Sequence, residues 1–159
     1  MGEYVMFDVE KKDLIILNLL QKNSKVSIKQ IAEESESTTA NVYSRIKHLE
    51  STGVIKKYVA LLDAPKLNRS IVALMLCQLV LEAPQTKNNV LAEISKLPEA
   101  QNVYLVSMGD WDVLVKFKVN CLSALKECED RMRSIGGVNA VSSYMVLEVA
   151  KETTELKIL

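Results

Sequence analysis

The sequence of 159 residues has one histidine, three cysteines and no long uninterrupted apolar segment. No CxxC pair occurs among Cys77, Cys121 and Cys128, and His48 alone offers little as a metal ligand. We therefore expect reduced thiols and no metal site. We also find no nucleophile–base pairing and no phosphate-binding loop, so we expect no catalytic residues and no cofactor.

Features of a secreted or membrane protein are also lacking. The longest apolar run, residues 71–81, is interrupted by Gln78 and is too short to span a bilayer. The N-terminal stretch MGEYVMFDVEKK contains acidic residues and is unlike a signal peptide. These features predict a soluble cytoplasmic protein without a membrane partner.

The chain has no excess of charge of either sign, with 20 basic and 20 acidic residues. Its length and its hydrophobic content of 48% allow one medium domain or two small ones. Residues 23–60 hold six Lys or Arg against four Glu, which leaves this stretch only slightly basic. Because phosphate neutralisation dominates affinity for DNA, one such unit would bind poorly, and several copies would be needed.

Residues 27–58 have the pattern of two short helices around a tight turn, followed by a strand over 54–62. Ser27, with Gln30 as its capping-box partner, can begin the first helix, and Thr38 can begin the second. Gly53 can end the second helix. An earlier helix over about 9–21 can start at Asp8. Three helices in this order predict a helix-turn-helix, whose second helix can enter the major groove of DNA.

The second helix has one apolar and one polar side. If Val42, Ile46 and Leu49 face the core, the opposite side carries hydrogen-bonding and small side chains, which suits contact with base edges. The alternative is an ordinary solvated helix face. The predicted DNA-contacting residues are Thr38, Thr39, Ala40, Asn41, Tyr43, Ser44, Arg45, Lys47 and His48.

The second half of the chain predicts strands over 71–82, 103–108, 111–119 and 138–149, with a helix stopped by Pro98 and another over 122–135. The order β-α-β-β-α-β is ferredoxin-like, so the fold class is α+β. Two helices cover only one face of such a sheet, and apolar residues on the other face predict self-association. We expect a helix-turn-helix domain at 1–53, a strand linker at 54–66 and a ferredoxin-like domain at 67–159. The tail 151–159 could add a strand or pack across an interface.

Several short motifs, in this order and spacing, resemble the Lrp/AsnC family of transcription regulators over nearly the whole chain. They include Asp13 with Ile16 and Leu17, the segment RIKHLE at 45–50, GVI at 53–55, GDWD at 109–112 and Gly137-Val138. The resemblance implies a C-terminal ferredoxin-like (RAM-type) domain that senses amino acids and drives assembly. It also implies dimers that associate further, often to octamers, which agrees with the need for several DNA-binding units.

The resemblance places a small effector, usually an amino acid, beside the loop at 109–112. Asp110 and Asp112 could accept hydrogen bonds from an α-amino group, Gly109 permits the tight turn, and Ser143 could add a hydroxyl. The alternative is that both aspartates are ordinary turn residues.

Two departures from the family pattern stand out. The inter-helix turn reads ESES at 34–37, where relatives carry an apolar residue and a glycine, and Val141 replaces a hydroxyl. Acidic residues near phosphates cost affinity, so DNA preference or strength could be unusual. The effector either differs from polar amino acids or is absent.

The leading hypothesis is a DNA-binding transcription regulator whose assembly or DNA affinity responds to an amino acid or a similar metabolite. One alternative is a metabolite sensor that has lost DNA recognition, motivated by the acidic turn and the neutral charge balance. A second is a nonspecific architectural protein. An enzyme is a third, since some haem-pathway decarboxylases share this layout, but the residues give it little support.

Overall fold

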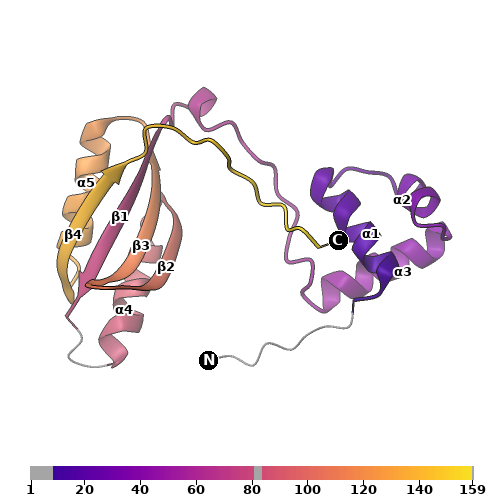
Figure 1. Ribbon diagram of the computed structural model, residues 1–159, viewed down its shortest axis with the longest axis horizontal. Helices are drawn as coiled ribbons and strands as arrows, with labels where there is room; N and C mark the ends of the chain where they lie inside the picture. The colour runs from indigo at the N-terminus through magenta and orange to yellow at the C-terminus, as the bar shows by residue number, and fades with distance from the viewer. Residues whose placement is uncertain (1–8, 81–83, 159) are drawn as a thin grey trace. The chain divides into compact units, whose positions relative to one another are not determined.

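The computed structural model describes residues 9–80 and 84–158 of the chain. The chain divides into two compact units (Figure 1). We call residues 1–61 together with 151–159 the head, and residues 62–150 the body.

The head is built on three helices, α1 (Lys11–Lys22), α2 (Ile28–Glu34) and α3 (Thr39–Ser51). The predicted three-helix arrangement is therefore confirmed, although α1 begins at Lys11, and Asp8, its predicted cap, lies outside the described residues. Apolar side chains recur at helical spacing, and those pointing inward are buried against one another. The buried core of the head consists of Ile16, Ile31, Ala32, Val42 and Leu49.

Polar caps set the ends of the two helices of the helix-turn-helix. The Ser27 hydroxyl accepts the Gln30 N–H at 3.1 Å, and the Thr38 hydroxyl accepts the Asn41 N–H at 3.2 Å, as predicted. The capping box is only half formed, because the Gln30 side chain donates to the Glu34 carboxylate at 3.1 Å instead of turning back to Ser27. Gly53 ends α3 with a φ of 75°, the left-handed conformation that glycine adopts without strain.

The turn between α2 and α3 contains a strained residue. Glu36 adopts a φ of 49°, in the left-handed region that disfavours a side chain. Its carbonyl accepts a hydrogen bond of 3.4 Å from the Lys12 ammonium, and the neighbouring Ser35 hydroxyl donates to the Ile31 carbonyl at 2.7 Å. The turn therefore keeps a backbone shape that suits glycine, although its sequence supplies glutamate.

The predicted strand over 54–62 does not form within the single chain. The ladders of the described sheet join β1 to β3, β1 to β4 and β2 to β3 only, so within the described residues this segment has no strand beside it. A strand needs a partner for its backbone groups. The segment leads into a short 3₁₀ helix, η1 (Pro65–Leu67), and leaves Leu61 and Leu62 73% and 70% exposed.

The body has the predicted ferredoxin-like order. Its elements are β1 (Ile71–Leu79), α4 (Pro84–Ser95), β2 (Ala100–Met108), β3 (Trp111–Val119), α5 (Leu122–Arg133) and β4 (Val138–Met145). The four strands are antiparallel in the order β2-β3-β1-β4. The end of the first predicted strand, residues 81 and 82, lies outside the described residues, and β4 stops at Met145, short of the predicted 149.

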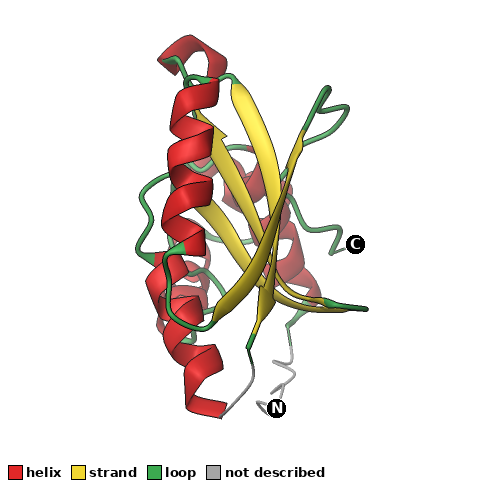
Figure 2. Cartoon of the chain, turned by 90° about the vertical axis from the view of Figure 1, so that its left-hand side faces the viewer, coloured by secondary structure: helices red, strands yellow, loops and turns green. Residues whose placement is uncertain are grey.

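The two faces of the sheet differ. Both helices of the body lie on one side of it (Figure 2), where Met75, Val115 and Phe117 are buried in the core. Since side chains alternate along a strand, the opposite side carries the residues between these. That open face includes Val72, Leu74, Leu76, Tyr104, Leu114 and Tyr144, all partly or largely exposed. The head and the body thus each have their own core, and among the described residues no helix of the body covers the second, apolar face of the sheet.

The C-terminal tail returns to the head. The side-chain amide of Gln21 on α1 donates to the Leu156 carbonyl at 3.1 Å and accepts the Leu156 N–H at 2.7 Å. No strand is assigned in residues 151–158, so the tail does not extend the described sheet. None of the described helices combines the length and the apolar character needed to cross a membrane.

Candidate DNA-binding surface and effector loop

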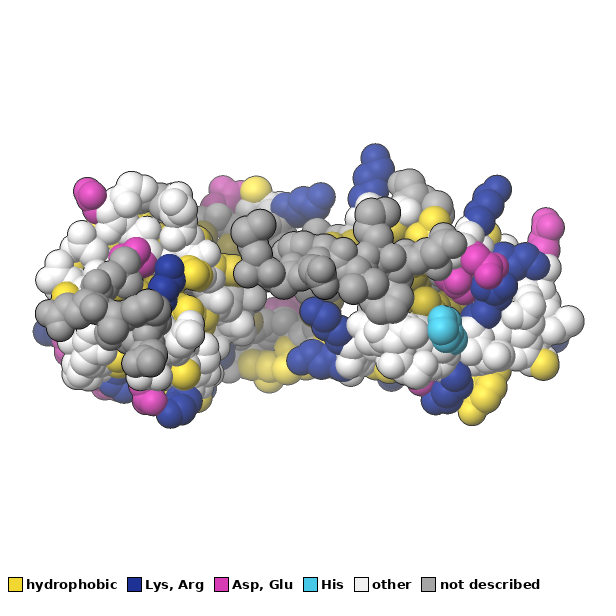
Figure 3. Space-filling model, turned by 90° about the horizontal axis from the view of Figure 1, so that it is seen from below, with side chains coloured by type: hydrophobic (Ala, Val, Ile, Leu, Met, Phe, Trp, Pro, Cys, Tyr) yellow, Lys and Arg dark blue, Asp and Glu magenta, His cyan; other side chains and the backbone are white. Residues whose placement is uncertain are grey.

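The outer side of α3 is exposed, as a DNA-reading surface requires. Eight of the nine predicted contact residues are exposed, and Arg45 is half-buried. Val42 and Leu49 are buried on the opposite side, so the helix is held by its apolar stripe. His48, the only histidine, lies at the surface of the head (Figure 3). The hydroxyl of Thr38 is already engaged as the helix cap.

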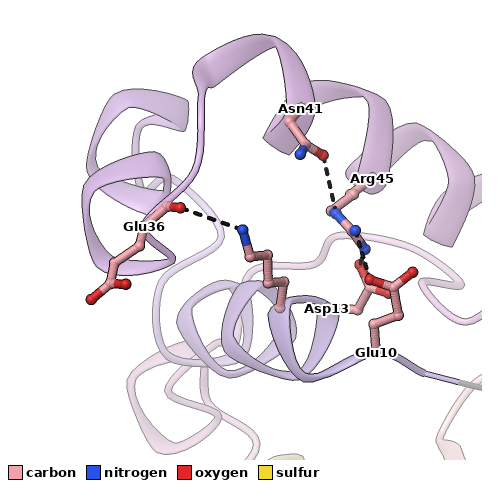
Figure 4. A network of polar contacts seen from close by, with 6 residues as sticks. Glu10, Asp13, Glu36, Asn41 and Arg45 are labelled. Carbon is pink, nitrogen blue, oxygen red and sulfur yellow. Dashed lines mark hydrogen bonds and ion pairs between the residues drawn. The ribbon is translucent and has the colours of Figure 1, made fainter.

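Arg45 turns away from this surface toward α1 (Figure 4). Its guanidinium donates to the Asp13 carboxylate at 2.9 Å, to Glu10 at 2.7 Å and to the Asn41 side-chain oxygen at 3.1 Å. The hydrogen bond to Asp13, and then that to Glu10, raises the pKa of Arg45, which stays cationic. Sequence reasoning assigned Arg45 to DNA, whereas its contacts join the second helix of the motif to α1.

Lys47 is also paired within the head. Its ammonium lies 2.8 Å from the Glu50 carboxylate and 5.8 Å from the centre of the Tyr43 ring. The other oxygen of Glu50 accepts the Tyr58 hydroxyl at 3.1 Å. The hydrogen bond to Glu50 raises the pKa of Lys47, and the same bond lowers the pKa of Glu50. Both cations of α3 are thus balanced by carboxylates, which leaves the surface less basic than the residue count suggested.

A hollow of about 410 Å³ lies beside this surface, between the start of α1 and α3. Its polar lining comes from Glu10, Asp13, Asn41, Ser44, Arg45, His48 and Thr52. The hydrogen bonds from Arg45 to Asp13, Glu10 and Asn41 already engage most of these polar groups. The exposed Ser44 and His48 join the hollow to the outer side of α3.

The predicted effector loop is the turn between β2 and β3. Gly109 has a φ of 61°, which explains why glycine is suited to this position. Asp110 is exposed, while one oxygen of Asp112 accepts the Leu79 N–H at 2.8 Å and so caps the end of β1. Asp110 is thus open to a ligand on this loop, and Asp112 has a structural partner.

Ser143 does not join the two aspartates within one chain. It lies opposite Met75 on β1 and faces the helices, where its hydroxyl donates to Glu129 at 2.9 Å. Arg133 donates to Glu129 at 2.6 Å and to the Val141 carbonyl at 2.7 Å. The hydrogen bond from Arg133, followed by that from Ser143, lowers the pKa of Glu129.

Asp112, by contrast, alternates with the core residue Val113 and points to the other side of the sheet. Val141 is buried in the core, which accounts for its lack of a hydroxyl. Sequence reasoning missed the Arg133–Glu129 pair, although their i, i+4 spacing on a helix was a usable signal.

Among the described residues, no three His, Cys, Asp or Glu side chains come together in a way that could hold a metal ion. The three cysteines are free thiols. Cys77 and Cys128 are buried and Cys121 is exposed.

Comparison with known proteins agrees with this division of the chain. Residues 9–56 match the family profile described as winged helix-turn-helix DNA-binding, and residues 73–156 match the Lrp/AsnC ligand binding domain. The chain is 32% identical to the HTH-type transcriptional regulator FL11 of Pyrococcus furiosus, over 97% of each chain. It is 31% identical to the leucine-responsive regulatory protein of Escherichia coli K12, over 95% of this chain and 92% of that one.

Solved structures give the same result. An AsnC family transcriptional regulator from Agrobacterium tumefaciens superposes with a TM-score of 0.87 at 29% identity, covering 92% of this chain and 95% of the other. A transcriptional regulator from Neisseria meningitidis in complex with L-Met gives 0.85 at 26% identity, with the same coverage. Together with the capped helix-turn-helix and the ferredoxin-like body, these matches show that the chain belongs to the Lrp/AsnC family of DNA-binding transcription regulators, which are not enzymes.

Proposed function

We propose that this regulator reads duplex DNA with the outer side of α3, and that an amino acid or related metabolite changes its assembly or its DNA affinity. The observation that carries the proposal is the exposed polar side of a capped α3 in a head with a DNA-binding family profile. In a helix-turn-helix, the first residues of the second helix contact base edges in the major groove.

The residues divide into different roles in this proposal. Tyr43, Lys47 and His48 lie on the exposed surface, and Arg45 holds the helix against α1 instead of meeting DNA. Thr38 caps the helix, so its main contribution is to place the first turn. The remaining contact residues in the proposal are Thr39, Ala40, Asn41 and Ser44.

We propose further that the protein acts as a homodimer that assembles into a larger complex such as an octamer. The apolar open face of the sheet and the exposed Leu61 and Leu62 would be covered by other copies. The balanced charges of Arg45 and Lys47 make one head a weak DNA binder, and several linked heads compensate by raising the effective concentration. Its place of action is the cytoplasm, where DNA is present and thiols stay reduced.

The effector in this proposal is an amino acid whose α-amino group is accepted at the 109–112 loop. Support comes from the exposed Asp110 and from the Neisseria meningitidis relative, which was solved with L-Met. Because Val141 is buried and Ser143 is bonded to Glu129, this chain offers few hydroxyls, which favours an apolar side chain in the effector.

The test is selection of bound sequences from a random duplex library, with and without pooled amino acids. We expect an enriched palindromic sequence whose binding changes with one amino acid, and weaker binding at higher salt. No enrichment from a folded protein, with weak salt-dependent binding to all duplexes, would favour a nonspecific architectural protein. No DNA binding at all, with an amino acid still bound, would favour the metabolite sensor.

A further inference from the structure

Glu50 stands at the centre of a small polar cluster on the head. It lies near the end of α3 and accepts from Lys47 through one oxygen and from Tyr58 through the other. Lys47 in turn lies over the ring of Tyr43. Both ends of the carboxylate are therefore occupied, and the ammonium is held between a carboxylate and an aromatic face.

This cluster lies on the outer side of α3, where we propose that DNA is contacted. The negative charge of the Glu50 carboxylate is unfavourable on a surface that meets phosphates. A carboxylate close to DNA phosphates costs affinity. An unpaired lysine there would be attracted to any phosphate, whereas a paired lysine presents no net charge at a distance. The pair therefore weakens attraction that is independent of DNA sequence.

We propose that Glu50, held by Tyr58, is a positioning residue that fixes Lys47 beside Tyr43 and so raises discrimination between the selected DNA site and other DNA. The inference rests on the proposed DNA-binding function of α3. Lys47 is held in one orientation before binding. A DNA group at the matching position can therefore accept a hydrogen bond from Lys47 without a further loss of side-chain conformational entropy. DNA that places no group there gains little from it.

Tyr58 connects this polar cluster to the segment that follows α3. Its hydroxyl keeps the Glu50 carboxylate turned toward Lys47, and burial followed by the bond to Glu50 raises the pKa of Tyr58, so the phenol remains a donor at neutral pH. Tyr58 is thus expected to affect α3 without touching DNA.

The experiment compares Glu50→Gln with the wild-type chain on two duplexes of equal length, one selected by the wild-type protein and one of random sequence. We expect Glu50→Gln to bind the random duplex at least about threefold more tightly, with a salt slope steeper by about 0.9, because one unpaired ammonium becomes available to phosphate. Affinity for the selected duplex should rise less, so that the ratio of the two affinities falls.

Glu93→Gln is the matched control. Glu93 pairs with Lys96 at 2.6 Å with the same three-residue separation, and it lies on α4 in the body. The variant makes the same charge change, and we expect it to leave the affinity ratio as in the wild type. Tyr58→Phe keeps every charge, so it should lower affinity for the selected duplex while leaving the salt slope and random-duplex affinity unchanged.

A double variant with Lys47→Ala separates positioning from general charge. Once Lys47 is absent, Glu50→Gln should raise the affinity for both duplexes by a smaller and equal factor, through loss of its own charge, and should leave the affinity ratio unchanged. Three results for Glu50→Gln would overturn the inference. They are a gain in affinity that is equal with and without Lys47, a ratio of the two affinities that does not fall, and weaker binding to both duplexes together with loss of folding. If the wild-type chain itself shows no salt-dependent DNA binding, the proposed function fails; if it binds and Glu50→Gln behaves like Glu93→Gln, only this inference fails.

Discussion

Arg45 of α3 and Asp13 of α1, 32 residues apart, form an ion pair of 2.9 Å that joins the second helix of the helix-turn-helix to the first helix of the head. The Asp13 side chain is only 10% exposed and that of Arg45 22%. An ion pair of such low exposure is costly to break, because the remaining partner keeps a poorly hydrated charge. The orientation of α3 therefore depends on this pair as well as on the apolar stripe.

Replacing Arg45 with Ala should destabilise the head by about 2–3 kcal/mol, because Asp13 would be left with an uncompensated charge. DNA binding would fall as a consequence of local unfolding. Hydrogen exchange of amides in α3 and in β1 measures this, since it reports the head and the body separately. Protection should fall in α3 and remain in β1.

Lys47→Ala is the control on the same helix, since it removes an exposed pair. It should cost less than about 1 kcal/mol of head stability and still weaken DNA binding at fixed salt. Equal loss of α3 protection in the two variants would contradict the assignment of Arg45 to positioning.

Glu36→Gly should stabilise the head by about 0.5–1 kcal/mol, because the left-handed backbone at a φ of 49° strains any side chain but glycine. The change also removes an acidic group beside the DNA-binding helix, so affinity for duplex DNA should rise. Exchange protection of α2 and α3 amides reports the first effect, and a binding titration reports the second. Glu36→Ala removes the same charge and keeps the strain, so it should raise DNA affinity without the gain in protection.

Cys121 should react with a thiol reagent before the other two cysteines. It is exposed, and the hydrogen bond with Ser123, then the backbone, lowers the pKa of its thiol. Burial, then Asp112, raises the pKa of Cys77 to about 11, and burial raises the pKa of Cys128. A pH series with mass-spectrometric mapping should show modification first at Cys121, and Cys121→Ser should remove the fast phase. A fast phase that persists in that variant would show that a buried thiol is accessible.

Ser143→Ala should destabilise the body near neutral pH and make its stability less dependent on acid pH. The pKa of Glu129 is lowered in the folded protein by Arg133 and then by Ser143. The unfolded chain therefore binds the proton first, and the stabilisation is present above the unfolded-state pKa and lost as pH falls through the folded-state value. Removing the hydroxyl should cost about 1 kcal/mol near neutral pH.

The difference between Ser143→Ala and the wild type should shrink as Glu129 becomes protonated. Denaturant unfolding at several pH values measures this difference. Ser142→Ala, the adjacent serine on β4, serves as the control because the hydroxyl that Glu129 accepts is that of Ser143. A constant difference across the acidic range would contradict the link to Glu129.

Much of the fold follows from local sequence. The caps Ser27 and Thr38 and the stop at Gly53 were predicted correctly, because a cap bonds to backbone groups only two or three residues away. The order of strands and helices in the body was also predicted, because apolar periodicity and turn residues are local signals. The strand expected over 54–62 does not form within the single chain, since extended propensity does not supply a partner strand.

Tertiary structure alone decided how the polar residues are used. The sequence indicated that Arg45 and Lys47 lie on the polar side of α3, yet only the packing of α1 turns Arg45 toward Asp13. Likewise, the strand register places Ser143 on the helix side of the sheet and gives Asp112 the end of β1 as its partner. Helical and strand periods determine which side of an element a residue occupies. The hydrogen-bond or ion-pair partner of a polar side chain depends on groups that folding brings together from distant parts of the chain. A local sequence pattern contains no information about these groups.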